Sequence, residues 1–131
     1  MILLDSNTLI HYLKGREPVV SRFHAAPRRE LAIPSIVAYE LEYGTRKFFS
    51  ARRAAVLSNF LAELIQAPFD HAAARQSADL RVDLEARGVM IGPMDLLIAG
   101  IALSRGAILV TNNTSEFSRI ARLEVADWTL D

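Results

Sequence analysis

The chain opens with Met-Ile-Leu-Leu-Asp-Ser-Asn-Thr-Leu-Ile, residues 1–10, in which Asp5 is the only charged side chain and ends an apolar run. Residues 2–4 are too few and too apolar for a surface helix, so we interpret them as a buried strand of a parallel sheet that is covered on both faces. Open α/β sheets bind their ligands in the crevice outside the carboxyl ends of their strands. The first strand therefore places a carboxylate at the edge where a ligand is expected.

The rest of the chain alternates between helical and strand patterns. We predict helices over residues 7–14, a short stretch after Pro18, 35–48, 51–65, 70–87 and 93–104, and strands over 31–33, 65–69, 107–110 and 125–128. Ile36, either Tyr39 or Glu40, Tyr43 and Phe48 recur at helical spacing, which predicts an amphipathic helix. Residues 111–117 are predicted to form a polar loop. The alternation predicts one three-layer α/β/α domain over residues 1–131, with a short central parallel sheet.

Composition limits the class of protein. The 131 residues carry 15 Lys and Arg against 15 Asp and Glu, and they contain no cysteine. The longest nearly apolar stretch, residues 89–103, is shorter than the ~20 residues of a membrane helix and contains Asp95. The N-terminus lacks the basic-then-apolar order of a signal peptide. We therefore expect a protein without a membrane span, located in the cytoplasm.

Three acids interrupt apolar runs. Asp5 lies in residues 1–10, Glu40 is the only charged residue of 31–41, and Asp95 is the only one of 89–103. Burying an unpaired carboxylate costs several kcal/mol, so these acids need partners. Because no lysine or arginine lies in the same runs, a divalent cation is the simplest partner that serves several carboxylates together.

The nature of the predicted ligands indicates which cation. Glu116 follows the last core strand and can reach the same crevice as Asp5. Oxygen ligands suit Mg²⁺ or Mn²⁺, whereas zinc is disfavoured because cysteine is absent and the three histidines are scattered. Neighbouring polar side chains that could orient ligands or waters are Asn7, Thr111, Asn112 and Asn113.

Each acid also has a simpler interpretation. Asp5 could only cap the helix that follows it. Asp95 could only complement a helix dipole, and Glu116 alone could be a solvated loop acid. The combination of four acids placed in this way favours a metal site over these local roles.

Four segments resemble, in order and spacing, the motifs of PIN-domain ribonucleases, and among these the VapC-type toxins of bacterial toxin–antitoxin pairs. The segments are Ile-Leu-Leu-Asp-Ser-Asn (2–7), Pro-Ser-Ile-Val-Ala-Tyr-Glu-Leu-Glu-Tyr-Gly (34–44), Ile-Gly-Pro-Met-Asp-Leu-Leu-Ile-Ala (91–99) and Val-Thr-Asn-Asn-Thr-Ser-Glu-Phe (110–117). The resemblance runs from residue 1 to about 128. It implies that Asp5, Glu40 and Asp95 bind metal, and that Glu116 matches a fourth, more variable acid. Asn113 stands where many PIN domains carry aspartate, so this chain has a neutral amide there.

The resemblance also implies a function and partners. The implied function is that of a Mg²⁺- or Mn²⁺-dependent endoribonuclease that cleaves structured RNA such as tRNA. The implied partners are a second copy of the chain, in a homodimer or a larger complex, and a VapB-type antitoxin that inserts an arginine among the carboxylates. The paired cations are candidates for contacts with RNA phosphates: Arg46, Lys47, Arg52 and Arg53.

Two other interpretations stay open. A PIN-like nuclease could act on branched DNA, although so compact a chain has no room for a clamp or arch insertion. A PIN-like fold could also serve for binding alone, with a metal site weakened by the neutral Asn113.

Overall fold

A five-stranded parallel sheet forms the centre of the protein. The structure is a computed structural model that describes residues 1–130. The strands lie in the order β3-β2-β1-β4-β5, and their bounds are β1 Ile2–Leu4, β2 Leu31–Pro34, β3 Ile65–Ala67, β4 Ile108–Val110 and β5 Glu124–Ala126. The predicted α/β class with a short parallel sheet is confirmed.

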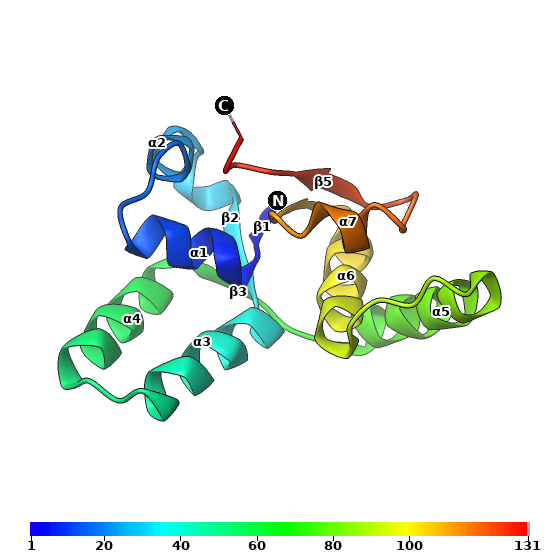
Figure 1. The fold of residues 1–131 in the computed structure, drawn as a ribbon, viewed down its shortest axis with the longest axis horizontal. Coiled ribbons are helices and arrows are strands. Elements are labelled where there is room, and N and C mark those ends of the chain that lie inside the picture. Colours follow the sequence, from blue (N-terminus) through cyan, green and yellow to red (C-terminus); the bar gives the residue numbers. More distant parts are fainter. Residues whose placement is uncertain (131) are drawn as a thin grey trace.

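Helices flank this sheet, with α1 to α4 gathered on one side of Figure 1 and the α5–α6 pair on the other. Their bounds are α1 Ser6–Leu13, α2 Val19–Ala25, α3 Ser35–Lys47, α4 Ala51–Glu63, α5 His71–Arg87, α6 Pro93–Arg105 and α7 Thr114–Phe117, with a 3₁₀ turn at Arg28–Glu30. Right-handed crossovers account for this division, because the chain moves across the sheet in one direction from β1 to β3 and in the opposite direction from β3 to β5.

The sheet order creates a switch point between β1 and β4. From β1 the chain continues to β2 on one side, and from β4 it continues to β5 on the other side. Leu3 and Leu4 of β1 are fully buried and pair with Leu109 and Val110 of β4. A crevice therefore opens beyond the carboxyl ends of these two central strands, where α/β sheets bind their ligands.

The structure corrects the prediction for residues 35–48. Tyr39, Tyr43 and Phe48 are 57%, 54% and 67% exposed, whereas Val37 and Leu41 are buried. The smaller aliphatic residues pack against the sheet, and the aromatic rings that suggested an apolar face point outward. Hydrophobic spacing identified the helix correctly but assigned its buried face wrongly.

The structure also differs from the prediction in the segment 111–117 and at the end of helix α4. The expected loop 111–117 contains a helical turn, α7, because Phe117 is fully buried and pulls this segment onto the core. Helix α4 ends at Glu63, two residues before the predicted end, because Ile65 pairs with Ala32 as the start of the edge strand β3. Within residues 1–130 no helix is long and apolar enough to cross a membrane.

Helices α5 and α6 approach each other closely at Gly100. A Cβ atom added there would lie 1.8 Å from Ser77 Oγ and 2.8 Å from the carbonyl oxygen of Ala73. Ser77 is buried and donates a hydrogen bond to the carbonyl oxygen of Leu96 at 3.3 Å. This contact holds α6, and with it Asp95, against α5.

Replacing Gly100 therefore tests the close packing of α6 against α5. We expect Gly100→Ala to lower the free energy of unfolding by about 1–3 kcal/mol, because the methyl group overlaps backbone and side-chain atoms. The matched control is Gly44→Ala in α3, where nothing lies within 4 Å of the added Cβ and alanine favours the helix by up to about 1 kcal/mol. Urea denaturation measures both, and equal stability of the two variants would contradict the close approach.

Candidate metal centre

Asp5 is held at the end of β1 by bonds to both neighbouring segments. The side chain is 4% exposed; its Oδ1 accepts the Ser6 N–H at 2.8 Å and its Oδ2 accepts the Thr111 hydroxyl at 2.7 Å. The backbone N–H of Asp5 donates to the carbonyl oxygen of Val110 at 2.9 Å. The helix-capping role is therefore real, and the same carboxylate also faces the end of β4.

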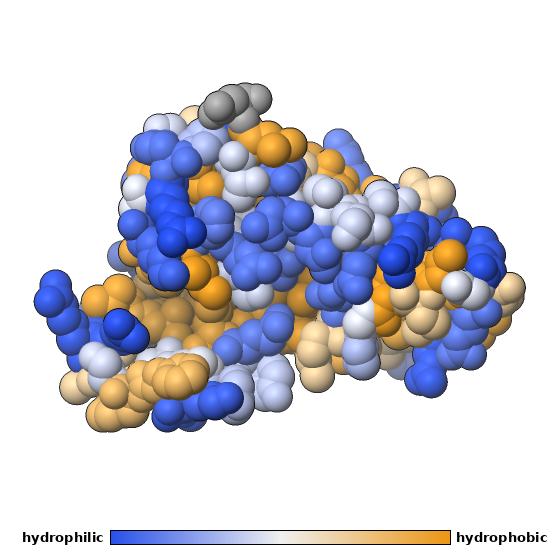
Figure 2. Space-filling model, in the orientation of Figure 1, coloured by the Kyte–Doolittle hydropathy of each residue, from blue (hydrophilic) through white to orange (hydrophobic). Residues whose placement is uncertain are grey.

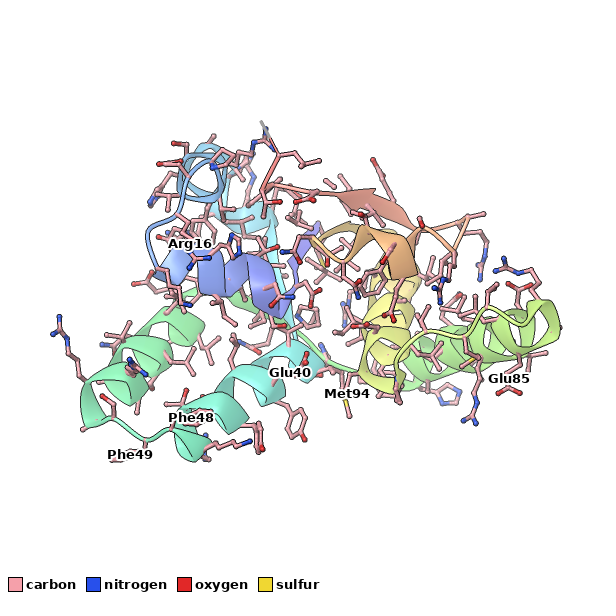
Figure 3. The ribbon with its side chains drawn as sticks, in the orientation of Figure 1. Arg16, Glu40, Phe48, Phe49, Glu85 and Met94 are labelled. Atoms are coloured by element: carbon pink, nitrogen blue, oxygen red, sulfur yellow. The ribbon has the colours of Figure 1, made fainter. Side chains whose placement is uncertain are left out.

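Glu40 enters the crevice from α3 (Figure 3). Its Oε1 is buried and has no hydrogen-bond partner. Burial raises the pKa of Glu40 above its usual range, and the charge of Asp5 raises it further. Buried polar atoms are normally satisfied, so this oxygen lacks a partner that the protein itself does not supply.

Asp95 lies in the first turn of α6, where Pro93 starts the helix and Gly92 precedes it. Burial raises the pKa of Asp95 to about 7, with further contributions from its hydrogen bond to Glu116 and from the charges of Asp5, Glu116 and Glu40. Asp95 thus experiences the charges of all three other predicted acids.

Glu116 completes the group from the short helix α7. Its pKa is lowered by the hydrogen bonds from Asp95 and Asn113, and further by the backbone N–H of Gly92 and the charge of Arg119. The shared proton therefore resides on the more buried Asp95, and Glu116 stays ionised. The structure brings all four predicted acids to the switch point.

The predicted polar neighbours have different surroundings. Thr111 is fully buried and bonds Asp5, and Asn113 donates from Nδ2 to Asp95 Oδ2 and Glu116 Oε2, each at 3.1 Å. Asn7 and Asn112 are exposed. Within residues 1–130 neither makes a side-chain hydrogen bond to the acids, so their roles stay predictions.

Sequence reasoning missed three contributors to this crevice. Thr8 is buried and donates to the carbonyl oxygen of Val110 at 3.2 Å. Gly92 supplies a backbone N–H to Glu116, and Arg119 lies near Glu116 while its Nη1 donates to the carbonyl oxygen of Met90 at 2.6 Å. A glycine before Pro93 was a signal that could have been found, whereas nothing local marks Thr8 or Arg119.

The donor set fits a hard divalent cation. Four carboxylates, one hydroxyl and one amide converge here, and no salt bridge among residues 1–130 involves any of the four acids. Such oxygen ligands suit Mg²⁺ or Mn²⁺ better than zinc. Among residues 1–130, no group of three or more histidine or acidic side chains is arranged closely enough to hold a metal ion without movement. Carboxylates that repel one another are expected to spread in this way, and the unpartnered Glu40 oxygen supports the fit.

The four candidate RNA-binding cations lie on α3 and α4. Arg46 pairs with Glu42 one helical turn away, so a phosphate would have to compete with that carboxylate. The Lys47 ammonium lies 5.8 Å from the Tyr43 ring centre and 5.5 Å from that of Phe48. The remaining two cations, Arg52 and Arg53, are exposed.

A groove of about 710 Å³ runs between α1, α3 and α4, and Glu40 lies in its wall. Figure 2 shows hydrophobic surface inside this hollow. Its apolar lining includes Ile10, Leu13, Leu41, Phe48, Val56 and Leu57, and its cations are Lys14, Arg52 and Arg53. The groove thus combines an apolar floor with positive charge and leads to the acidic crevice.

Comparison with known proteins places this geometry in a family. The PIN-domain family model matches residues 2–123. The chain is 36% identical over 128 residues to a tRNA(fMet)-specific endonuclease VapC of Shigella flexneri, covering 97% of each protein, and 38% identical to the protein of that name from Salmonella typhimurium, covering 96% of each.

This chain is a PIN-domain protein of the VapC family. A solved structure agrees at the level of the fold: VapBC2 from Rickettsia felis, bound to a DNA fragment from its promoter, has a TM-score of 0.88 at 34% identity, over 98% of this chain and 99% of that chain. The resemblance predicted from the four motifs is confirmed.

The pKa of Asp95 in this PIN domain predicts how stability depends on pH without metal. The pKa of Asp95 is about 7 in the folded state and 3.8 in the unfolded chain. The stabilisation from its bound proton is therefore complete below about pH 3.8 and is lost as pH rises to about 7. In excess chelator we expect the thermal unfolding midpoint of Asp95→Asn to be higher than that of the wild type at pH 8. The difference between the two midpoints should grow between pH 4 and pH 7.

The control for this measurement is Asp79→Asn, which removes an exposed carboxylate from α5. Its midpoint should follow that of the wild type at every pH. A midpoint difference between Asp95→Asn and wild type that is constant from pH 4 to pH 8 would contradict the raised pKa.

Proposed function

We propose that this chain, as a single PIN domain over residues 1–131, is a Mg²⁺- or Mn²⁺-dependent endoribonuclease toxin whose substrate is a structured RNA, with tRNA as the first candidate. The observation that carries the proposal is the meeting of four acids from four different elements, one with a buried oxygen that lacks a partner. Family membership and the names of the tRNA-cleaving relatives support it. We place the protein in the cytoplasm, where such a substrate is found.

The acids have distinct roles in this proposal. Asp5, Glu40 and Asp95 hold the cation, and Glu116 completes its surroundings. When bound, the cation lowers the pKa of a coordinated water and stabilises charge on the attacking and leaving oxygens of the phosphodiester. Asp95 and Glu116 hydrogen-bond each other in the absence of metal, so this pair is suited to orient the attacking water.

The cations beside the groove are proposed to bind the RNA backbone. Arg52 and Arg53 lie on the first turn of α4, and Arg46 and Lys47 lie on the last turn of α3. Contacts of this kind position a substrate through its phosphates and carry no sequence information. A salt dependence of RNA binding that is unchanged in the Arg52→Gln/Arg53→Gln double variant would contradict this role for those two arginines.

Cleavage of purified tRNA tests the proposed chemistry. We expect the wild-type chain with Mg²⁺ or Mn²⁺ to produce discrete fragments, and Asp5→Asn to reduce the rate by at least about 100-fold, because the loss of a metal ligand removes several kcal/mol of transition-state stabilisation. Gel analysis of the fragments measures both. Excess chelator should abolish cleavage by the wild type.

Asp79→Asn on the outer face of α5 is the matched control and should cleave at the wild-type rate. Fragments that survive in Asp5→Asn and in chelator would point to a contaminating nuclease. If no fragments form from any RNA with either metal, the binding-module interpretation is favoured, and if only branched DNA is cut, the DNA-nuclease interpretation is favoured.

The groove between α1, α3 and α4 is the proposed site for a segment of a VapB-type antitoxin. Its apolar lining, its cations and its end at Glu40 suit an amphipathic peptide that carries an arginine into the acidic crevice. We also propose that a second copy of the chain covers the outer face of α3, where Tyr39 and Tyr43 are exposed. A solution mass that stays at the 14.5 kDa of one chain at all concentrations would contradict this dimer.

A charged residue in the groove should separate inhibition from cleavage. Val56 is 50% exposed and lines the groove from α4. We expect Val56→Glu to weaken inhibition by the cognate antitoxin at least tenfold and to lower the cleavage rate by a smaller factor, since a carboxylate that an apolar peptide face covers costs more than 1.4 kcal/mol. The control is Val82→Glu on α5, at a valine that is 71% exposed, and equal inhibition of the two variants would contradict the assignment of the groove.

A further inference from the structure

Asn113 is a neutral residue that contacts two of the four acids. Its Nδ2 donates to Asp95 Oδ2 and to Glu116 Oε2, each at 3.1 Å. An amide nitrogen carries two hydrogens, so both are engaged and each goes to a different carboxylate. Asn113 therefore connects the first turn of α6 to α7 through one side chain.

The backbone of Asn113 fixes where that amide lies. Its N–H donates to Thr111 Oγ1 at 3.0 Å, and the Thr111 hydroxyl donates onward to Asp5 Oδ2 at 2.7 Å. Thr111 is fully buried at the end of β4. A chain of neutral donors thus links three of the four acids, and the amide cannot turn away without both Asp95 and Glu116 losing a hydrogen bond.

The amide would compete with any cation that bound Asp95 and Glu116 together, because its two hydrogens already engage Asp95 Oδ2 and Glu116 Oε2. An amide also adds no negative charge to offset that of a second ion, whereas an aspartate in its place would add one. The buried Oε1 of Glu40 has no hydrogen-bond partner, and Asp5 is linked to Asn113 only through Thr111.

We propose that Asn113 is a positioning residue whose amide holds Asp95 and Glu116 together and thereby limits the centre to one divalent cation. This inference rests on the proposed function, because it assumes that the four acids bind metal. It goes beyond that function by stating how many ions this chain takes up and which residue sets the number.

Titration of the metal-free chain with Mn²⁺, followed by calorimetry and by the electron paramagnetic resonance signal of free Mn²⁺, counts the bound ions. We expect one ion per wild-type chain and two per Asn113→Asp chain, because aspartate cannot donate to its neighbours and adds a fifth carboxylate. The matched control is Asn112→Asp, which makes the same change at the adjacent exposed residue. It should bind one ion.

The possible outcomes distinguish a failure of the proposed function from a failure of the role of Asn113. A folded wild-type chain that binds no Mn²⁺ overturns the proposed metal-dependent function, and the inference with it. Two ions in the wild type, or one ion in a folded Asn113→Asp chain, overturns the role of Asn113 alone. Two ions in Asn112→Asp would show that added charge, and not the amide bridge, sets the number. Two ions in the wild type overturn the inference even if Asn113→Asp does not fold.

Discussion

The hydrogen bond from Thr111 to Asp5 is the contact on which the candidate centre depends. It joins the ends of β1 and β4, the two strands from which the chain departs in opposite directions. Thr111 is fully buried and Asp5 nearly so, so the hydroxyl gives the carboxylate a donor that solvent cannot replace. The charge of Asp5 raises the pKa of Glu40 and that of Asp95, the two acids that reach it from α3 and α6.

The crevice concentrates negative charge that the fold only partly compensates. Asp5 has two donors and Glu116 has hydrogen bonds from Asn113 and Gly92, but the buried Oε1 of Glu40 has none. Ionisation of Asp95 and Glu40 is the most unfavourable, because burial and their acidic neighbours raise the pKa values of both groups. The close packing of α5 and α6 at Gly100 is part of what holds these repelling groups together. Stability is thus given up at the place where a cation would restore it.

Local signals predicted much of this arrangement. The strand at residues 2–4, the helix that begins after Asp70 and ends at Gly88, and the helix that begins at Pro93 follow from apolar runs, a capping side chain and a left-handed glycine. The prediction failed where packing overruled periodicity. Tyr39 and Tyr43 face outward because Val37 and Leu41 already fill the space against the sheet. Phe117 made a helical turn of a segment whose composition favoured a loop.

The sequence by itself determined which acids could meet, since Asp5, Glu40 and Asp95 are the only charges in their apolar runs and Glu116 follows a core strand. Only the tertiary structure decided how they are held. The Asn113 bridge, the Arg46–Glu42 pair and the unpartnered oxygen of Glu40 depend on side-chain directions and, for the first and last, on elements far apart in the chain. Periodicity and capping are local properties, whereas the partner of a buried polar atom is set by which helices the crossovers bring to the same end of the sheet.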